Sequence, residues 1–102
     1  FHSPLMNNVK IKLESIIKKY KFKDVQIPIY QNTNAKKNLN GIDIKKNLIN
    51  QVNSPVYWMQ TINQMLRNHP TTFLEIGPSN VLTKLNKNIN KNINSLNFNT
   101  LL

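Results

Sequence analysis

The alternation of helix-like and strand-like apolar patterns constrains the fold of this chain more than any other feature. Apolar residues recur at three-to-four-residue steps in four stretches, which predicts four amphipathic helices. These helices are expected near residues 4–20, 43–52, 55–66 and 80–89. Two short runs rich in β-branched and aromatic residues, 24–30 and 71–78, predict buried strands, and a last strand is expected within 95–102. Helices that alternate with short buried strands are typical of an α/β fold with parallel pairing.

Polar residues and prolines predict where these elements begin and how they are joined. Ser3, Asp43 and Ser54 are the expected N-caps of the first three helices, because a short polar side chain can accept a hydrogen bond from the first free backbone N–H groups. Residues 31–41 are polar and predict a loop. Pro28 predicts an edge or irregular pairing for the strand that contains it, because proline has no N–H to donate.

The composition limits the class of protein. The 102 residues predict one domain or part of one. The sequence has no cysteine, which excludes a disulfide framework and a thiolate metal site. No apolar run approaches the ~20 residues that span a bilayer, so we expect a soluble chain without a membrane partner.

The net charge of +10 raises two interpretations, a nucleic-acid partner and an acidic protein partner. Thirteen of the fourteen cations are lysine, whereas base recognition favours the planar fork of arginine, so we do not expect nucleic acid. The chain also has nineteen asparagines, many of them next to lysine. Joint enrichment of lysine and asparagine is what an AT-rich genome would produce, and we favour this compositional interpretation. An acidic partner is the functional alternative.

Four short stretches carry more specific information: FHSPLM at 1–6, IPIYQNTNA at 27–35, NQVNSPVYW at 50–58 and FLEIGPSNVLTKL at 73–85. In this order and spacing they resemble the C-terminal part of malonyl-CoA:acyl-carrier-protein transacylases and of the acyltransferase domains of fatty-acid and polyketide synthases. The resemblance covers residues 1–90 as the C-terminal part of the large acyltransferase subdomain. It implies an α/β-hydrolase-like core with a short parallel sheet flanked by helices, incomplete as a fold by itself. Residues 91–102 are then an Asn/Lys-rich tail with a short strand.

The resemblance also implies the catalytic residues. In these enzymes a serine in a Gly-His-Ser-x-Gly turn attacks the malonyl thioester, and a histidine acts as its base, because a serine hydroxyl is a poor nucleophile until its proton is removed. The base corresponds to His2. The backbone carbonyl that orients this histidine corresponds to Gln51, at the end of the second expected helix. None of the five serines lies in a G-x-S-x-G turn, so the nucleophile is expected upstream, in a part of the enzyme outside this chain.

Two further residues are implied as substrate-binding. Phe1 directly precedes the base, where an aromatic residue goes with malonyl rather than methylmalonyl selection in related synthase domains. Asn32 lies in the family's Asn-containing turn. One position departs from the family pattern, since the usual Gly-Pro-Gly is Gly77-Pro78-Ser79 here. A serine would be strained at that third position if the turn required a positive φ.

The expected substrate is malonyl-CoA, a coenzyme A thioester, and the expected partner is an acidic acyl carrier protein, with no metal or redox cofactor. The expected compartment is a plastid-type organelle or mitochondrion in a eukaryote and the cytoplasm otherwise. A non-catalytic carrier-protein-docking module and a basic nucleic-acid-binding module are the alternatives. A Gly-His-Ser-x-Gly sequence upstream in the same polypeptide would distinguish the enzyme from both.

Overall fold

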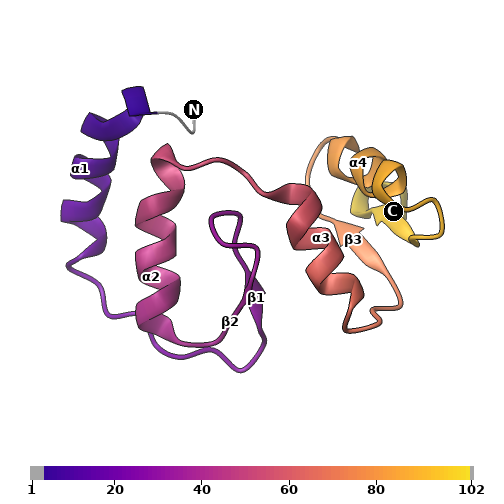
Figure 1. Cartoon of the computed structure of the whole chain (residues 1–102), viewed down its shortest axis with the longest axis horizontal. Coiled ribbons are helices and arrows are strands. Elements are labelled where there is room, and N and C mark those ends of the chain that lie inside the picture. The colour runs from indigo at the N-terminus through magenta and orange to yellow at the C-terminus, as the bar shows by residue number, and fades with distance from the viewer. Residues whose placement is uncertain (1–3, 102) are drawn as a thin grey trace. The chain divides into compact units, whose positions relative to one another are not determined.

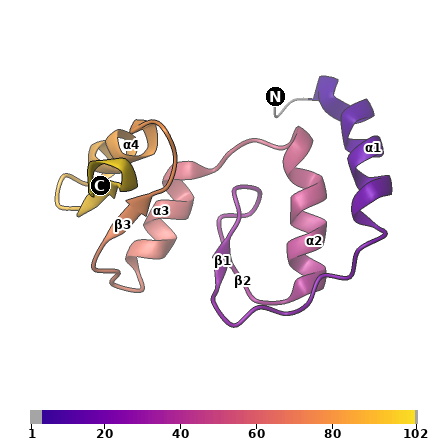
Figure 2. The same cartoon turned by 180° about the vertical axis from the view of Figure 1, so that it is seen from behind.

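The computed structural model describes residues 4–101, so Phe1, His2 and the expected N-cap Ser3 lie outside the described residues. The chain divides into two compact units, Phe1–Thr61 and Ile62–Leu102, and the elements of both are drawn in Figures 1 and 2. The structure is α/β, with helices, one short antiparallel pair and one short parallel pair of strands. Within residues 4–101, no helix has both the length and the apolar character that crossing a membrane requires.

In the first unit two helices, α1 (Asn7–Ile17) and α2 (Gly41–Asn50), lie side by side and pack against each other (Figures 1 and 2). Its other elements are η1 (Pro4–Met6), β1 (Ile29–Tyr30), β2 (Lys37–Asn38) and η2 (Gln51–Asn53). Ile17 of α1 and Ile44 and Ile49 of α2 are buried. Both helices thus bury apolar residues and expose polar ones, in agreement with the amphipathic pattern that predicted them.

The expected buried strand at 24–30 is much shorter in the structure. Only β1 is extended and paired, with Ile29 opposite Asn38 and Tyr30 opposite Lys37 in an antiparallel hairpin. Ile27 is 80% exposed, so burial of this run was wrongly predicted. The irregular pairing expected from Pro28 is confirmed, because regular pairing begins only after it. The expected loop at 31–41 contains the partner strand β2.

Two of the expected helix starts are also wrong. The N-cap of α2 is Asn40, whose Oδ1 accepts hydrogen bonds from the N–H groups of Ile42 at 2.9 Å and Asp43 at 3.2 Å. Asp43 therefore lies inside the first turn. Ser54 does not cap the following helix, because its hydroxyl donates backwards to the Asn50 carbonyl at 2.6 Å. The helix after it, α3 (Trp58–Leu66), begins four residues later.

The second unit contains a strand–helix–strand arrangement. Its elements are β3 (Phe73–Glu75), α4 (Val81–Ile89), β4 (Ser95–Asn97) and η3 (Phe98–Leu101). Strands β3 and β4 are parallel, with Phe73 opposite Ser95, and α4 connects them and packs on both. Parallel pairing needs such a crossover. The alternation of patterns thus correctly predicted the parallel pair and a last strand within 95–102.

Candidate functional site

The first described residues of the chain pack against the segment that begins with Gln51. Elements η1 and α1 both contact η2. Asn53 in η2 donates a hydrogen bond from Nδ2 to Oδ1 of Asn7 at 2.8 Å, across 46 residues of sequence. The structure therefore brings the residues that follow His2 in the sequence next to the residues that follow Gln51. His2 itself lies outside the described residues.

Gln51 stands at the junction of α2 and η2, as the sequence predicted for the end of the second helix. Its N–H group donates to the carbonyls of Asn47 and Ile49, which closes the last turn of α2. Its carbonyl oxygen accepts a long hydrogen bond of 3.5 Å from the N–H of Ser54. A carbonyl oxygen has two lone pairs, so this bond is compatible with a second donor at the same atom.

Asn32 is half-buried in the turn that follows β1. Its carbonyl accepts a hydrogen bond from the N–H of Tyr57 at 3.1 Å. Residues 51–57 connect α2 to α3, and we call them the connecting segment. It contains Gln51, bonds to Asn7 through Asn53, and bonds to Asn32 through Tyr57. Three stretches that the sequence singled out separately thus meet along this segment.

Buried amide side chains fix the hairpin that carries Asn32 onto α2. Gln31, the residue before Asn32, donates from Nε2 to the Ile44 carbonyl at 3.0 Å, and both partners are buried. Asn47 donates from Nδ2 to Oε1 of Gln31 at 3.1 Å. Asn47 also donates from Nδ2 to Oδ1 of Asn38 in β2, at 3.5 Å. Because polar groups removed from water must be paired, these bonds hold the hairpin in one position on the helix.

In the second unit, the carboxylate of Glu75 bridges the Gly77-Pro78-Ser79 turn. Glu75 at the end of β3 accepts hydrogen bonds from the N–H of Leu82 at 3.2 Å, the N–H of Thr83 at 2.9 Å and the Thr83 hydroxyl at 2.8 Å. Within residues 4–101, Ala35 and His69 are the only non-glycine residues with positive φ. The serine that departs from the family's Gly-Pro-Gly pattern is therefore accommodated without a left-handed backbone.

The pKa of the Glu75 carboxyl is shifted by opposing effects. Desolvation by burial is the largest single effect and would raise the pKa. The hydrogen bonds from Thr83, Leu82 and Asn97 together outweigh it, so the pKa lies below its ordinary value. The carboxylate is consequently charged at neutral pH, where it satisfies the free N–H groups at the start of α4.

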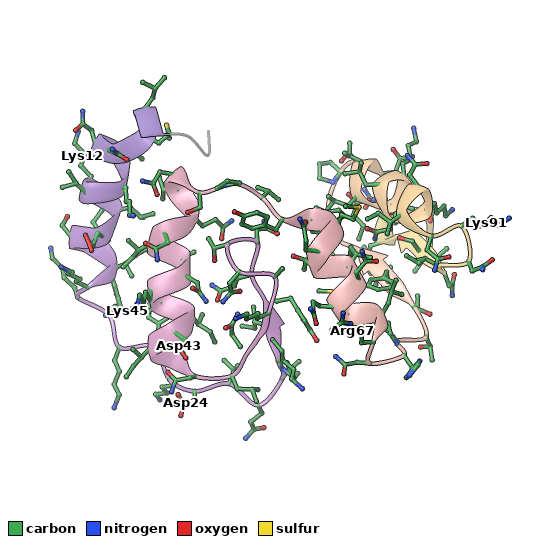
Figure 3. The ribbon with its side chains drawn as sticks, in the orientation of Figure 1. Lys12, Asp24, Asp43, Lys45, Arg67 and Lys91 are labelled. Carbon is green, nitrogen blue, oxygen red and sulfur yellow. The ribbon has the colours of Figure 1, made fainter. Side chains whose placement is uncertain are left out.

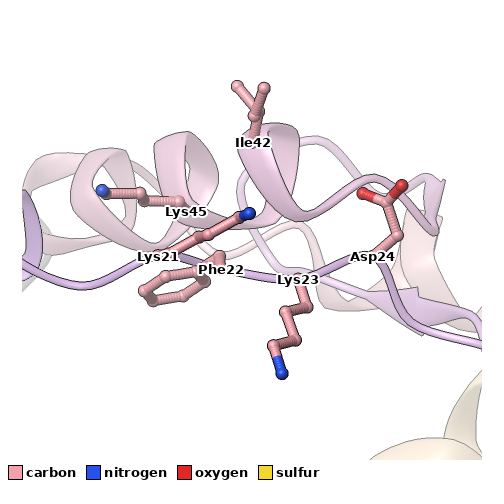
Figure 4. Close-up of a pocket in the computed structure, with 6 residues that line it drawn as sticks. All are labelled: Lys21, Phe22, Lys23, Asp24, Ile42 and Lys45. Atoms are coloured by element: carbon pink, nitrogen blue, oxygen red, sulfur yellow. The ribbon is translucent and has the colours of Figure 1, made fainter.

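An open hollow of about 490 Å³ in the first unit involves none of the predicted site residues. It is lined by Lys21, Phe22, Lys23, Asp24, Ile42 and Lys45 (Figure 4). Lys45 donates from Nζ to the Tyr20 carbonyl at 2.7 Å and to the Lys18 carbonyl at 3.3 Å, just past the end of α1. Its ammonium group lies 5.9 Å from the centre of the Phe22 ring. Lys45 thus serves the free carbonyls at a helix end, a role for which cations are suited.

Other charged side chains lie away from this hollow. Figure 3 shows Lys12 on α1 and Lys91 after α4 extending outwards. In the part of the chain that the structure describes, no three His, Cys, Asp or Glu side chains gather as a metal site would need.

Sequence reasoning missed the amide side chains that build this arrangement. Asn7, Asn53, Asn47 and Gln31 make hydrogen bonds between segments that are distant in sequence. Because the compositional interpretation treats all nineteen asparagines alike, it does not distinguish Asn7, Asn47 and Asn53 from the rest. Gln31 and Asn53 lie within two of the quoted stretches, but only the pairing in space shows what these side chains do.

Comparison with known proteins places this arrangement in a class. No family model matches the chain. A curated relative from Bacillus subtilis, named malonyl CoA-acyl carrier protein transacylase, is 36% identical over 96 residues, which are 94% of this chain and 30% of the relative. The crystal structure of a protein of that name from Clostridium perfringens matches with a TM-score of 0.88 and 31% identity, over 95% of this chain and 31% of that one.

A third match is to a malonyl-transacylase solved in complex with the acyl carrier protein of a type II polyketide synthase. It has a TM-score of 0.89 and 30% identity, and covers 96% of this chain and 32% of the other. The fold is therefore that of the α/β acyltransferases. More specifically, the chain corresponds to the C-terminal portion of the malonyl CoA-acyl carrier protein transacylases. It spans about a third of the length of the relatives it matches.

Proposed function

We propose that this chain supplies the base and part of the substrate site of a malonyl-CoA:acyl-carrier-protein transacylase in fatty acid biosynthesis. The observation that carries the proposal is the connecting segment 51–57. It joins the stretch after His2, the Gln51 carbonyl and the Asn32 turn, which the family resemblance names as parts of one site. A chain built only as a basic docking module would have no need to bring these three stretches together.

The proposed chemistry is acyl transfer through a serine ester. His2 accepts the proton of a serine hydroxyl from the part of the enzyme outside this chain, while the serine oxygen attacks the malonyl thioester carbon. The carbon–sulfur bond breaks, and the proton passes from His2 to the sulfur of coenzyme A. In the second half the thiol of the carrier protein's prosthetic group attacks the ester, gives its proton to His2, and the serine leaves with that proton.

Gln51 is proposed to orient the base. A histidine that accepts a proton at Nε2 must hold its other proton at Nδ1 on a fixed acceptor. The backbone carbonyl of Gln51 is at a helix end beside the stretch that follows His2, and it can accept from a second donor. Phe1 and Asn32 are proposed to contact the malonyl group, with no metal or redox cofactor taking part.

Acyl carrier protein is the proposed partner. The matched transacylase from the type II polyketide pathway was solved with its carrier protein. Carrier proteins of these pathways are acidic, and this chain has a net charge of +10. Opposite charges would speed the encounter of the two proteins.

The test is malonyl transfer to acyl carrier protein by the full-length enzyme that contains this chain. His2→Ala is expected to lower the rate by ~10²–10⁴-fold, the usual contribution of a general base. His69→Ala is the matched control, because His69 is exposed and lies in the second unit. Transfer by His2→Ala at nearly the wild-type rate would remove His2 from the mechanism.

A second variant separates the backbone role of Gln51 from a side-chain role. Gln51→Ala keeps the carbonyl and is expected to retain transfer within a few-fold of wild type. A loss as large as that of His2→Ala would show that the side chain of Gln51, rather than its carbonyl, acts in the reaction.

A further inference from the structure

The start of α2 contains the only Asn-Gly pair of the sequence, Asn40-Gly41. An asparagine followed by glycine is chemically the least protected amide in a protein, because no side chain hinders the glycine nitrogen. That nitrogen can attack the asparagine side-chain carbon and close a five-membered imide. The pair is therefore a reactive element at a position that the fold uses.

A residue with a side chain at position 41 would slow deamidation, but the fold does not accommodate one. A Cβ at Gly41 would lie 2.1 Å from the carbonyl oxygen of Phe22 and 2.7 Å from the carbonyl carbon of Lys23. Both are backbone atoms, so the clash could not be relieved by turning a side chain. Asn40 is also needed, because its Oδ1 accepts from the N–H groups of Ile42 and Asp43 as the N-cap.

In the structure, both groups that would react, the Gly41 N–H and the Asn40 side chain, are held in hydrogen bonds. The N–H of Gly41 donates to Oδ1 of Asp24 at 2.8 Å, across 17 residues of sequence. This nitrogen must lose its proton to attack, and a hydrogen bond to a carboxylate holds that proton in place. The Asn40 side chain is fixed by its two capping bonds, and its backbone is extended, with φ −80° and ψ 125°. Figure 3 shows Asp24 and Asp43 at the same end of α2, and Figure 4 shows the Asp24 carboxylate at the rim of the hollow.

We propose that Asn40-Gly41 is a spontaneous deamidation site that Asp24 keeps closed in the folded protein. When the bond to Asp24 opens, the Gly41 nitrogen gives its proton to water and bonds to the Asn40 Cγ. The Cγ–Nδ2 bond breaks, and ammonia leaves with a proton from solvent. Water then opens the imide at either carbonyl, which yields aspartate or isoaspartate. The net change is one water consumed and one ammonia released, without an oxidant or a reductant.

The isoaspartate product would damage α2 more than the aspartate product. Aspartate is itself a good N-cap, so that product can still accept from the first turn. Isoaspartate adds one carbon to the main chain just before the Gly41 nitrogen, and this displaces a glycine that lies closely against the Phe22 backbone. The helix start could not be rebuilt around it. Because Gln51 ends the same helix, the modification would also reach the connecting segment.

The experiment compares deamidation in the full-length enzyme that contains this chain, during incubation at mildly alkaline pH. Peptide mass spectrometry would locate the product at Asn40, and enzymatic methylation of isoaspartate would quantify it. Asp24→Ala removes the acceptor and is expected to speed the reaction roughly tenfold or more, the scale of one hydrogen bond to a charged group. Asp24→Asn keeps a neutral acceptor oxygen and is expected to fall between Asp24→Ala and wild type. Lys23→Ala, an exposed neighbour, is expected to match wild type.

Deamidation rates measured in urea distinguish protection by Asp24 from an effect of the substitution on overall folding. All four proteins are expected to deamidate at one common, faster rate when unfolded, and amide exchange in α1 under native conditions would show whether Asp24→Ala still folds. Equal rates for folded wild type and folded Asp24→Ala would overturn the proposal. A wild-type deamidation rate that is the same in native buffer and in urea would also overturn the proposal. This second comparison does not require any variant to fold.

Discussion

At the scale of single residues, Glu75 shows how one carboxylate fastens a strand to the helix that follows it. It accepts three hydrogen bonds from Leu82 and Thr83, and these bonds keep the pKa of its carboxyl low against the opposing effect of burial. Because the folded-state pKa lies below the unfolded-state value, Glu75 stabilises the fold at pH values above the unfolded-state pKa. This contribution is lost as the pH falls through the folded-state pKa.

The start of α4 should therefore loosen in acid. The protection of the Leu82 and Thr83 amides, measured relative to their intrinsic exchange rate at each pH, is expected to fall in acid. The loss begins below the ordinary glutamate value of about 4.3 and is complete once the pH has passed through the lower folded-state pKa of Glu75. Glu75→Gln is expected to show fast exchange already at neutral pH and little further change in acid. Glu14→Gln is the control, because Glu14 pairs with Lys18 only at 3.8 Å on the exposed face of α1. A pH profile that Glu75→Gln leaves unaltered would assign the acid sensitivity to another group.

At the scale of elements, the hairpin β1–β2 depends on α2 rather than on its own strands. Its ladder has two residue pairs, too few to be stable alone. The amides of Gln31 and Asn47 supply the attachment at the buried face of α2. The position of the Asn32 turn is thus set by side chains of a helix that comes later in the sequence.

Asn47→Ala should test that attachment. It leaves Oε1 of Gln31 without its Asn47 donor, and an unsatisfied buried polar group costs ~1–3 kcal/mol. The higher helix propensity of alanine offsets less than ~1 kcal/mol of this loss. Urea unfolding is therefore expected to show a lower midpoint for Asn47→Ala. Lys46→Ala, at an exposed position of the same helix, is expected to stay within ~0.5 kcal/mol of wild type. Equal midpoints for the two variants would mean that the hairpin is held by other contacts.

At the scale of the whole molecule, the lysines that give the chain its positive charge differ in their structural roles. Lys45 bonds to carbonyls at the end of α1, so reversing its charge would disturb the fold as well as any partner. Lys36 and Lys46 are exposed and better suited to test docking. If they help to attract an acidic carrier protein, the attraction acts between exposed groups and must respond to salt.

In the full-length enzyme, Lys36→Glu/Lys46→Glu is expected to raise KM for the carrier protein and to lower its association rate. Salt should have the same effect on wild type, as the screening length falls from ~10 Å at 0.1 M to ~3 Å at 1 M. Hydrolysis of the malonyl-enzyme by water should barely change, because no docking is involved. Lys84→Glu/Lys87→Glu, an equal charge change on α4, is the control for net charge. A KM that is flat with salt and indifferent to Lys36→Glu/Lys46→Glu would support the compositional interpretation.

Features that depend on neighbouring residues could be predicted from the sequence. Apolar spacing along one face predicted the helices that contain Ile17, Ile44 and Val81, and the β-rich run before Gly77 predicted β3. The same patterns predicted the parallel pair, because a helix between two short strands returns the chain in the same direction. Four motifs, read in order, indicated the family. All of these signals are local or ordered along the chain, so one sequence is enough to express them.

Which residues cap helices, pair in strands and meet in space could be seen only in the folded chain. Asn40 rather than Asp43 caps α2, because Gly41 must lie against the backbone of Phe22 and so fixes where the helix begins. Lys37 and Asn38 form a strand inside a polar run, because they pair with β1 and the Asn47 amide of α2 donates to Oδ1 of Asn38. The meeting of Asn7, Asn32 and Gln51 along residues 51–57 rests on hydrogen bonds between segments up to 46 residues apart. Such bonds depend on distances in space, which no local pattern of residues encodes.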